Sequence, residues 1–242
     1  MFSSNEPPVI LIAFIAGLSR GFSGFGAALI FMPMASLFIG PKLAAPVLMV
    51  VDGIVALPLI PPAFKQANMR EICFLLAGAI VGVPFGTYVL KFTDPLVLRW
   101  IIAGLAISML ALLISGWRYK AMPHDAAAVA TGGLSGLFSG IAQIGGPPII
   151  AYLLGSNREG VNIRATTIVF FAGTGLMSAV TYIAGGIVTS QVLTLALVTG
   201  PAYGLGLWLG VRMFGLANAE VFRRVCFGLI ALSVVLSLPI WG

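Results

Sequence analysis

Two similar phrases hold most of the residues whose side chains could do chemistry. GLSRGFSGFG occupies residues 17–26, and GLSGLFSGIA occupies residues 133–142 and is followed by QIGGPP. Serine hydroxyls, the glutamine amide and the arginine guanidinium donate hydrogen bonds, and glycine lets a ligand approach the backbone N–H groups closely. Donors of this kind would bind a small oxyanion. The candidate substrate-binding residues are Ser19, Arg20, Ser23, Gly24, Phe25, Gly26, Ser135, Ser139, Gly140, Gln143, Gly145 and Gly146.

The composition places both phrases in a membrane. Of the 242 residues, 60% are hydrophobic and 8% are charged, whereas a soluble domain averages about 25% charged residues. The mean hydropathy is +1.09. So few charges could not cover the surface of a soluble protein of this size, and the sequence therefore predicts an integral membrane protein. The net charge of +6 comes from basic residues scattered through short connections, which is typical of membrane topology and not of nucleic-acid binding.

The apolar residues fall into eight segments, and a membrane helix needs roughly 20 such residues. The segments run approximately over 8–39, 43–62, 71–91, 95–116, 124–155, 161–186, 190–212 and 218–240. The polar stretches between them are too short for a soluble domain. The pattern predicts an all-α polytopic membrane protein with a single transmembrane domain over residues 1–242.

The first and fifth segments, 8–39 and 124–155, are too long for one upright helix. Each holds one of the glycine-serine phrases near its middle. Because a glycine in a helix interior costs about 1 kcal/mol relative to alanine, several glycines together should break the helix. We expect two short helices in each segment, joined by a non-helical bend near residues 20–25 and 139–146. The sequence does not decide whether these segments cross the membrane or re-enter.

The chain also repeats itself. Six of the ten residues in the first phrase recur 116 positions later, where Gly17, Leu18, Ser19, Phe22, Ser23 and Gly24 match Gly133, Leu134, Ser135, Phe138, Ser139 and Gly140. A weaker match near the end of each half has an offset of 124. We therefore predict two homologous four-segment repeats, at about 8–116 and 124–242. Duplicated halves with interrupted segments in matching positions indicate a transporter site, and the alternative is that the small residues only allow close helix packing.

The basic residues indicate how the two halves are oriented. With Arg20 left out, twelve remain, and the two sides receive four and eight of them if every segment crosses once. If the first and fifth segments instead enter and return on the same side, the split is three and nine, and the smaller set is Lys42, Lys91 and Arg99. Because Lys and Arg collect on the cytoplasmic side, the re-entrant arrangement is favoured. It makes the two repeats inverted relative to each other and leaves both termini outside the cytoplasm.

Each predicted break creates the N-terminus of a second short helix. Such an N-terminus offers free N–H groups and about half a positive charge, so two of them meeting near the membrane midplane would bind an anion. Arg20 adds a full positive charge in a substrate-binding or coupling role, although it could also snorkel or pair with a structural carboxylate. Asp52 is the only carboxylate well inside a segment. It could couple transport to protons, which are a possible partner, or pair with Arg20, or be a structural aspartate.

The residue types do not favour an enzyme. The chain has one histidine, His124, in a polar link, and its two cysteines, Cys73 and Cys226, lie in separate apolar segments. No serine at membrane depth therefore has a histidine to activate it, and no cysteine spacing is typical of a metal site. We expect no catalytic residue, no metal and no cofactor. A channel stays open as an alternative, because two helix breaks can line a pore as well as a carrier site.

The two phrases, with their flanks, resemble the motifs of a known family. AGLSRGFSGFGAALIFMPM is similar to the first-repeat motif of the sulfite exporter TauE/SafE family, also called the toluene-sulfonate uptake permeases. GGLSGLFSGIAQIGGPPIIAYLL is similar to the second-repeat motif, which is the more specific of the two, and the resemblance covers essentially the whole chain. Ala27 and Ala28 stand where many members carry more glycine, which would alter the width of the pocket on that side.

The resemblance implies a secondary transporter in a bacterial inner membrane. Its cargo would be sulfite or a small organosulfonate such as sulfoacetate, which is the type of oxyanion that the glycine-serine phrases suit. The direction of transport, the coupling ion and the oligomeric state do not carry over. The alternatives are an anion channel and a transporter of a different small solute on the same plan. A cation site would need carboxylates or carbonyl groups at the C-termini of the short helices, and Asp52 is the only carboxylate available.

Overall fold

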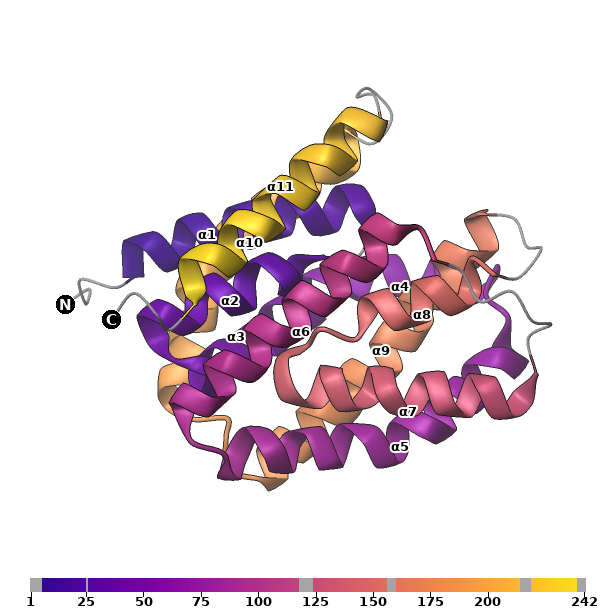
Figure 1. Ribbon diagram of the computed structural model, residues 1–242, viewed down its shortest axis with the longest axis horizontal. Helices are drawn as coiled ribbons and strands as arrows, with labels where there is room; N and C mark the ends of the chain where they lie inside the picture. The colour runs from indigo at the N-terminus through magenta and orange to yellow at the C-terminus, as the bar shows by residue number, and fades with distance from the viewer. Residues whose placement is uncertain (1–5, 25, 118–123, 156–159, 214–218, 239–242) are drawn as a thin grey trace.

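In the computed structural model, helices account for the regular structure of the residues that are described, namely 6–24, 26–117, 124–155, 160–213 and 219–238 (Figure 1). The elements are α1 (Glu6–Ser23), α2 (Ala27–Ile39), α3 (Pro41–Ala56), a 3₁₀ turn η1 (Leu57–Leu59), α4 (Ile60–Phe64), α5 (Met69–Phe92), α6 (Pro95–Ser115), α7 (Asp125–Ala142), α8 (Gly146–Leu153), α9 (Gly160–Ala184), α10 (Ser190–Met213) and α11 (Ala219–Ser237).

The helix lengths fit a polytopic membrane protein. Within the described ranges, five helices are long and apolar enough to span a bilayer: Pro41–Phe64, which joins α3, η1 and α4, then Met69–Phe92, Pro95–Ser115, Gly160–Ala184 and Ser190–Met213. Pro7–Phe22, Ala27–Ile39 and Val225–Ser237 are shorter apolar helices. The all-α membrane fold predicted from composition and segment length is confirmed.

Both long segments are broken, as predicted. The first stops at Ser23 and resumes at Ala27, and between them Gly24 and Gly26 have φ angles of 76° and 100°. Glycine reaches this left-handed region without the steric cost that a side chain imposes. The fifth segment stops at Ala142 and resumes at Gly146, and here the left-handed residue is Gln143, with a φ of 57°.

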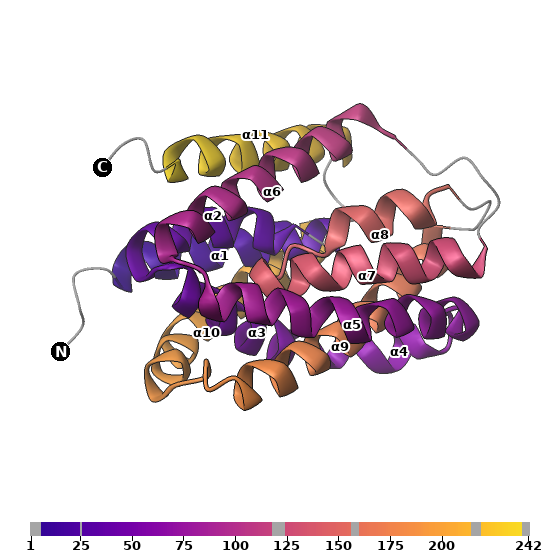
Figure 2. The same cartoon turned by 60° about the horizontal axis from the view of Figure 1, so that its bottom comes forward.

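The two parts of each broken segment fold back on one another as a hairpin. Figures 1 and 2 show α7 and α8 running in opposite directions along each other, and α1 and α2 also pack together. In Figure 1 the α1–α2 hairpin starts and ends at the left of the molecule, near both chain termini. The α7–α8 hairpin starts and ends at the right. The two turns therefore point into the molecule from opposite ends.

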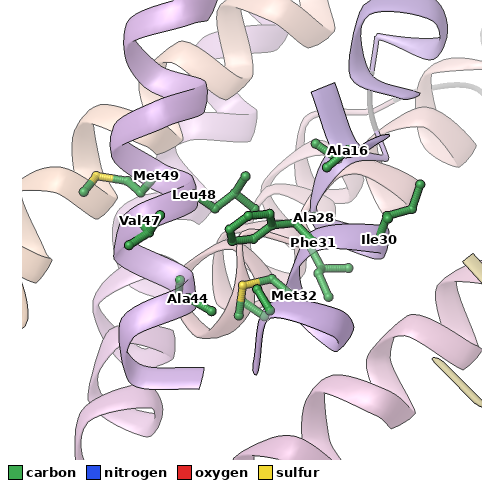
Figure 3. Close-up of a cluster of buried hydrophobic side chains, with 14 of the residues drawn as sticks. Ala16, Ala28, Ile30, Phe31, Met32, Ala44, Val47, Leu48 and Met49 are labelled. Atoms are coloured by element: carbon green, nitrogen blue, oxygen red, sulfur yellow. The ribbon is translucent and has the colours of Figure 1, made fainter. Parts of the chain in front are cut away.

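Helix α2 lies in the centre of the structure and is buried on all sides over its first ten residues, 27–36, apart from the half-buried Met34. Its sequence carries no charged residue, as expected for a helix without a solvent-facing stripe. Figure 3 shows Phe31 and Met32 of α2 pointing toward α3, where Leu48 and Ala44 lie in the same buried cluster. This packing fixes the start of α2, which is one side of the first break.

The closest helix contacts cross between the two halves of the chain. Helix α1 packs along α10, and α7 packs along α5. Glycines make both contacts possible: a Cβ atom on Gly206 would lie 2.1 Å from the carbonyl oxygen of Phe14, and one on Gly82 would lie 2.1 Å from that of Gly133. The small residues therefore do serve close helix packing. They do so in the same helices that lead into the breaks, so the packing also holds the breaks in place.

Candidate functional site

Both breaks border a single cavity of about 470 Å³. Its wall is mainly apolar carbon from α2, α3, α9 and the η1–α4 turn. The predicted site residues that line it are Arg20, Gly24, Gly26, Ser139, Gln143 and Gly146. Half of the twelve predicted site residues thus share one cavity although they come from the two different phrases.

Arg20 reaches across the first break. Its Nε atom donates to Oδ1 of Asp52 over 3.1 Å, and its Nη1 atom donates to the carbonyl oxygen of Gly24 over 2.7 Å. The guanidinium carbon also lies 5.1 Å from the centre of the Phe171 ring, in cation–π geometry. Of the alternatives that the sequence left open for Arg20, the ion pair with Asp52 is the one formed here.

Asp52 is held by a second partner, which sequence reasoning missed. The hydroxyl of Tyr203 donates to the same Oδ1 atom over 2.5 Å. The side chains of Arg20 and Asp52 are 11% and 28% exposed, so this is an interior pair and not a solvated surface pair. A charge-assisted network of this kind orients both charged groups toward the cavity wall.

Gln143 organises the second break. Its Nε2 atom donates to the carbonyl oxygen of Ser139 over 3.0 Å and to the Tyr182 hydroxyl over 3.3 Å. The Tyr182 hydroxyl in turn donates to the carbonyl oxygen of Gly140 over 2.8 Å. The Ser135 hydroxyl donates to the carbonyl oxygen of Gly145. These contacts tie the end of α7 to the turn, and they occupy both N–H bonds of the Gln143 amide.

Four of the predicted site residues lie away from the cavity. Ser19 is buried with its hydroxyl 3.6 Å from the sulfur of Cys226, and Ser135 is buried inside the second hairpin. Gly140 packs against the backbone of Val83 on α5, and Gly145 leaves the room that the Ser139 hydroxyl occupies. These four residues stabilise the two helix breaks but do not line the cavity. Phe25 and the side chain of Ser23 lie outside the described residues.

Two further residues at the cavity were not predicted as ligands. Arg164, at the start of α9, lines the cavity and adds a second basic side chain to it. Because Arg164 lies at the edge of an apolar segment, its sequence position does not distinguish it from a basic residue that only orients the protein in the membrane. Phe171 lines the same cavity. An aromatic residue in an apolar segment is common, so the sequence does not indicate that Phe171 borders a cavity.

The two helix N-termini at the cavity differ chemically. Ala27 and Ala28 open α2 and line the cavity, and helix geometry leaves their N–H groups without an intrahelical acceptor. Helix α8 opens with Gly146, Pro147 and Pro148, and proline has no N–H group. The first break therefore offers more backbone donors as well as Arg20. Among the described residues, no group of three or more His, Cys, Asp or Glu side chains could hold a metal ion.

A polytopic helical protein whose two interrupted segments meet at one internal cavity has the architecture of a membrane transporter. The chain belongs to the sulfite exporter TauE/SafE family, whose model matches residues 9–237. It is 29% identical over 189 residues to the probable inner membrane transporter protein TsaS of Comamonas testosteroni, an alignment that covers 74% of this chain and 76% of that protein. No solved structure matches the chain significantly. The protein is thus a multi-pass transporter of the inner membrane, in agreement with the resemblance found in its motifs.

Proposed function

We propose that the protein is a secondary transporter of small sulfur oxyanions, namely sulfite or organosulfonates such as sulfoacetate. The observation that carries this proposal is the shared cavity: Arg20, the start of α2 and the second break all border one space. A guanidinium beside an open helix N-terminus suits an oxyanion, because both supply N–H donors and positive potential. The family match supports the same class of cargo.

In this proposal the substrate binds at the first break, near Arg20, Gly24 and Gly26, and Ser139, Gln143 and Gly146 form the opposite side of the cavity. Arg164 contributes to the positive potential around the cavity. A cation is a poorer fit, because Asp52 is the only carboxylate among the described residues that line the cavity, and it already pairs with Arg20.

The proposal includes an inverted repeat. If α1 corresponds to α7 and α5 to α10, exchanging the two repeats converts the α1–α10 contact into the α7–α5 contact. The two contacts are then equivalent. The two hairpins that open toward opposite ends of the molecule support an axis in the membrane plane (Figure 1). The three-to-nine distribution of basic residues then puts the larger set in the cytoplasm and both termini outside it.

The test is a flux assay in proteoliposomes with sulfite, sulfoacetate, sulfate and thiosulfate as substrates. We expect saturable uptake of sulfite or sulfoacetate that exceeds the uptake of sulfate. A flux that rises linearly with concentration would identify a channel instead. No flux of any of the four anions, from protein that remains folded in the liposomes, would contradict the proposed cargo.

A further inference from the structure

The carboxylate of Asp52 occupies the Nε side of the Arg20 guanidinium, which is one of the positions at which an anion could bind Arg20. Its Oδ1 atom lies 3.1 Å from Nε of Arg20, and both residues line the cavity. The guanidinium also donates to the carbonyl oxygen of Gly24, so it is held at the break on one side and by Asp52 on the other. An anion that binds Arg20 through the planar pair of donors at Nε and Nη2 therefore competes with Asp52 for the Nε–H group.

The surroundings of Asp52 contain few other ionisable groups. Helix α3, which carries Asp52, packs against α2, α5, α6, α7, α9 and α10. Tyr203 comes from α10 and Arg20 from α1, while α9 brings Arg164 to the cavity wall. Within the described chain, α2 has no titratable side chain, and α5, α6 and α7 contribute none to the cavity. The charge that balances Arg20 is accordingly that of Asp52.

We propose that Asp52 is a built-in competitor of the substrate and that a proton on Asp52 releases Arg20 to the anion. This inference rests on the proposed function. One proton from solution converts the Asp52 carboxylate to a carboxylic acid, and the negative charge of one sulfonate takes its place beside Arg20. The local charge is zero before and after, so each monoanion binds together with one proton.

Tyr203 suits both states of Asp52. Its hydroxyl donates to the carboxylate in the present structure. Because a phenol can also accept a hydrogen bond, the same hydroxyl can turn to accept the proton of a neutral Asp52. The acid therefore keeps a partner after Arg20 has moved to the substrate, which avoids an unsatisfied polar group in the interior.

The test measures the affinity of purified protein for methanesulfonate as a function of pH. This probe is used because its sulfonate keeps one negative charge over the whole range, whereas sulfite itself titrates near neutrality. For the wild type, we expect the association constant to fall about tenfold per pH unit once Asp52 is ionised, because one proton is linked to each anion. Asp52→Asn should bind methanesulfonate with an affinity that does not change with pH.

Asp125→Asn is the matched control. Asp125 also pairs with an arginine, Arg70, but both side chains are exposed and outside the cavity. This variant should keep the pH dependence of the wild type. The same dependence in Asp52→Asn as in the wild type would overturn the inference.

A second measurement needs no variant and keeps the inference testable if Asp52→Asn does not fold. Adding methanesulfonate to wild-type protein in weak buffer, at a pH where Asp52 is ionised, should take up close to one proton for each anion bound. Binding without proton uptake, or an affinity that is constant with pH, would overturn the inference and leave the proposed function intact. No binding of methanesulfonate, sulfite or sulfoacetate at any pH would contradict the proposed function itself.

Discussion

At the scale of single residues, Arg20 is the side chain on which the candidate site depends. It contacts Asp52, the Gly24 carbonyl and the Phe171 ring. Since a hydrogen bond to a charged group contributes roughly 1.5–3 kcal/mol, we expect Arg20→Ala to weaken sulfonate binding by at least about 10- to 150-fold. Arg20→Lys should recover part of the loss, because lysine keeps the charge but lacks the planar fork. Titration calorimetry measures both.

Arg70→Ala provides the control for Arg20→Ala. It also removes an arginine from an ion pair, but this pair lies at the surface. Exposed pairs contribute little to stability, so this variant should bind the sulfonate as the wild type does. Equal affinity in a folded Arg20→Ala variant would show that Arg20 is not a ligand.

Gln143 gives a second prediction at this scale, because it combines a left-handed backbone with a full side chain. A non-glycine residue in that conformation costs roughly 1–2 kcal/mol, and its amide contacts with Ser139 and Tyr182 offset the cost. Gln143→Ala loses the amide contacts and keeps the backbone strain. Gln143→Gly loses the amide contacts as well, but it also relieves the strain, because glycine adopts the left-handed conformation without a steric cost. We expect the alanine variant to melt at a lower temperature than the glycine variant. An alanine variant as stable as the wild type would refute this account of the turn.

The sequence predicted part of the candidate site. Arg20, Ser139 and Gln143 could be placed at a cavity because polar residues beside clustered glycines in an apolar segment indicate a helix break, and a break at membrane depth lines a cavity or is buried in protein. Tyr203 and Tyr182 could not be found, because a buried tyrosine in a membrane segment resembles any other aromatic residue. Their roles depend on which acceptors come within reach once α10 packs on α3, which carries Asp52, and α9 packs on α7, which carries Gly140, and no local pattern encodes that.

At the scale of helices, the sequence predicted the lengths and the breaks but not the partners. The end of α6, for example, lies within one residue of the predicted 95–116 segment, because apolar length and turn residues are local properties. In the sequence, Gly206 and Gly210 stand 124 positions after Gly82 and Gly86, so they belong to the weaker match between the two halves. In the structure they bring α10 against the backbone of α1, which is a long-range contact.

The α1–α10 contact can be tested within a single helix. A Cβ atom on Gly206 would lie 2.1 Å from the Phe14 carbonyl oxygen, whereas nothing lies within 4 Å of one on Gly200. We expect Gly206→Ala to lower the melting temperature. Gly200→Ala should leave it unchanged or raise it, because alanine favours a helix interior by about 1 kcal/mol over glycine. Equal melting temperatures of the two variants would mean that α1 and α10 do not pack this closely.

At the scale of the whole molecule, the proposed orientation can be tested by labelling. Lys91 belongs to the smaller set of basic residues and Lys65 to the larger set. In a Cys73→Ser background, Lys91→Cys should react with a membrane-impermeant maleimide on intact cells, and Lys65→Cys should react only after the cells are opened. Cys226 is buried and should contribute little background. Labelling of the Lys65→Cys protein alone on intact cells would reverse the proposed orientation.

Because α1 packs on α10 and α7 packs on α5, the two helix pairs can form only in a fixed order while the chain is being synthesised. Helix α7 finds α5 already synthesised, but α1 must wait for α10, since Gly17 contacts the backbone of Tyr203. At about 5–20 residues per second, that wait lasts on the order of 10–40 s. During it, the glycine-lined face of α1 has only lipid or a temporary partner to cover it. A nascent chain that stops after α9 therefore retains a finished α5–α7 pair and an α1–α2 hairpin whose glycine-lined face lacks its α10 partner.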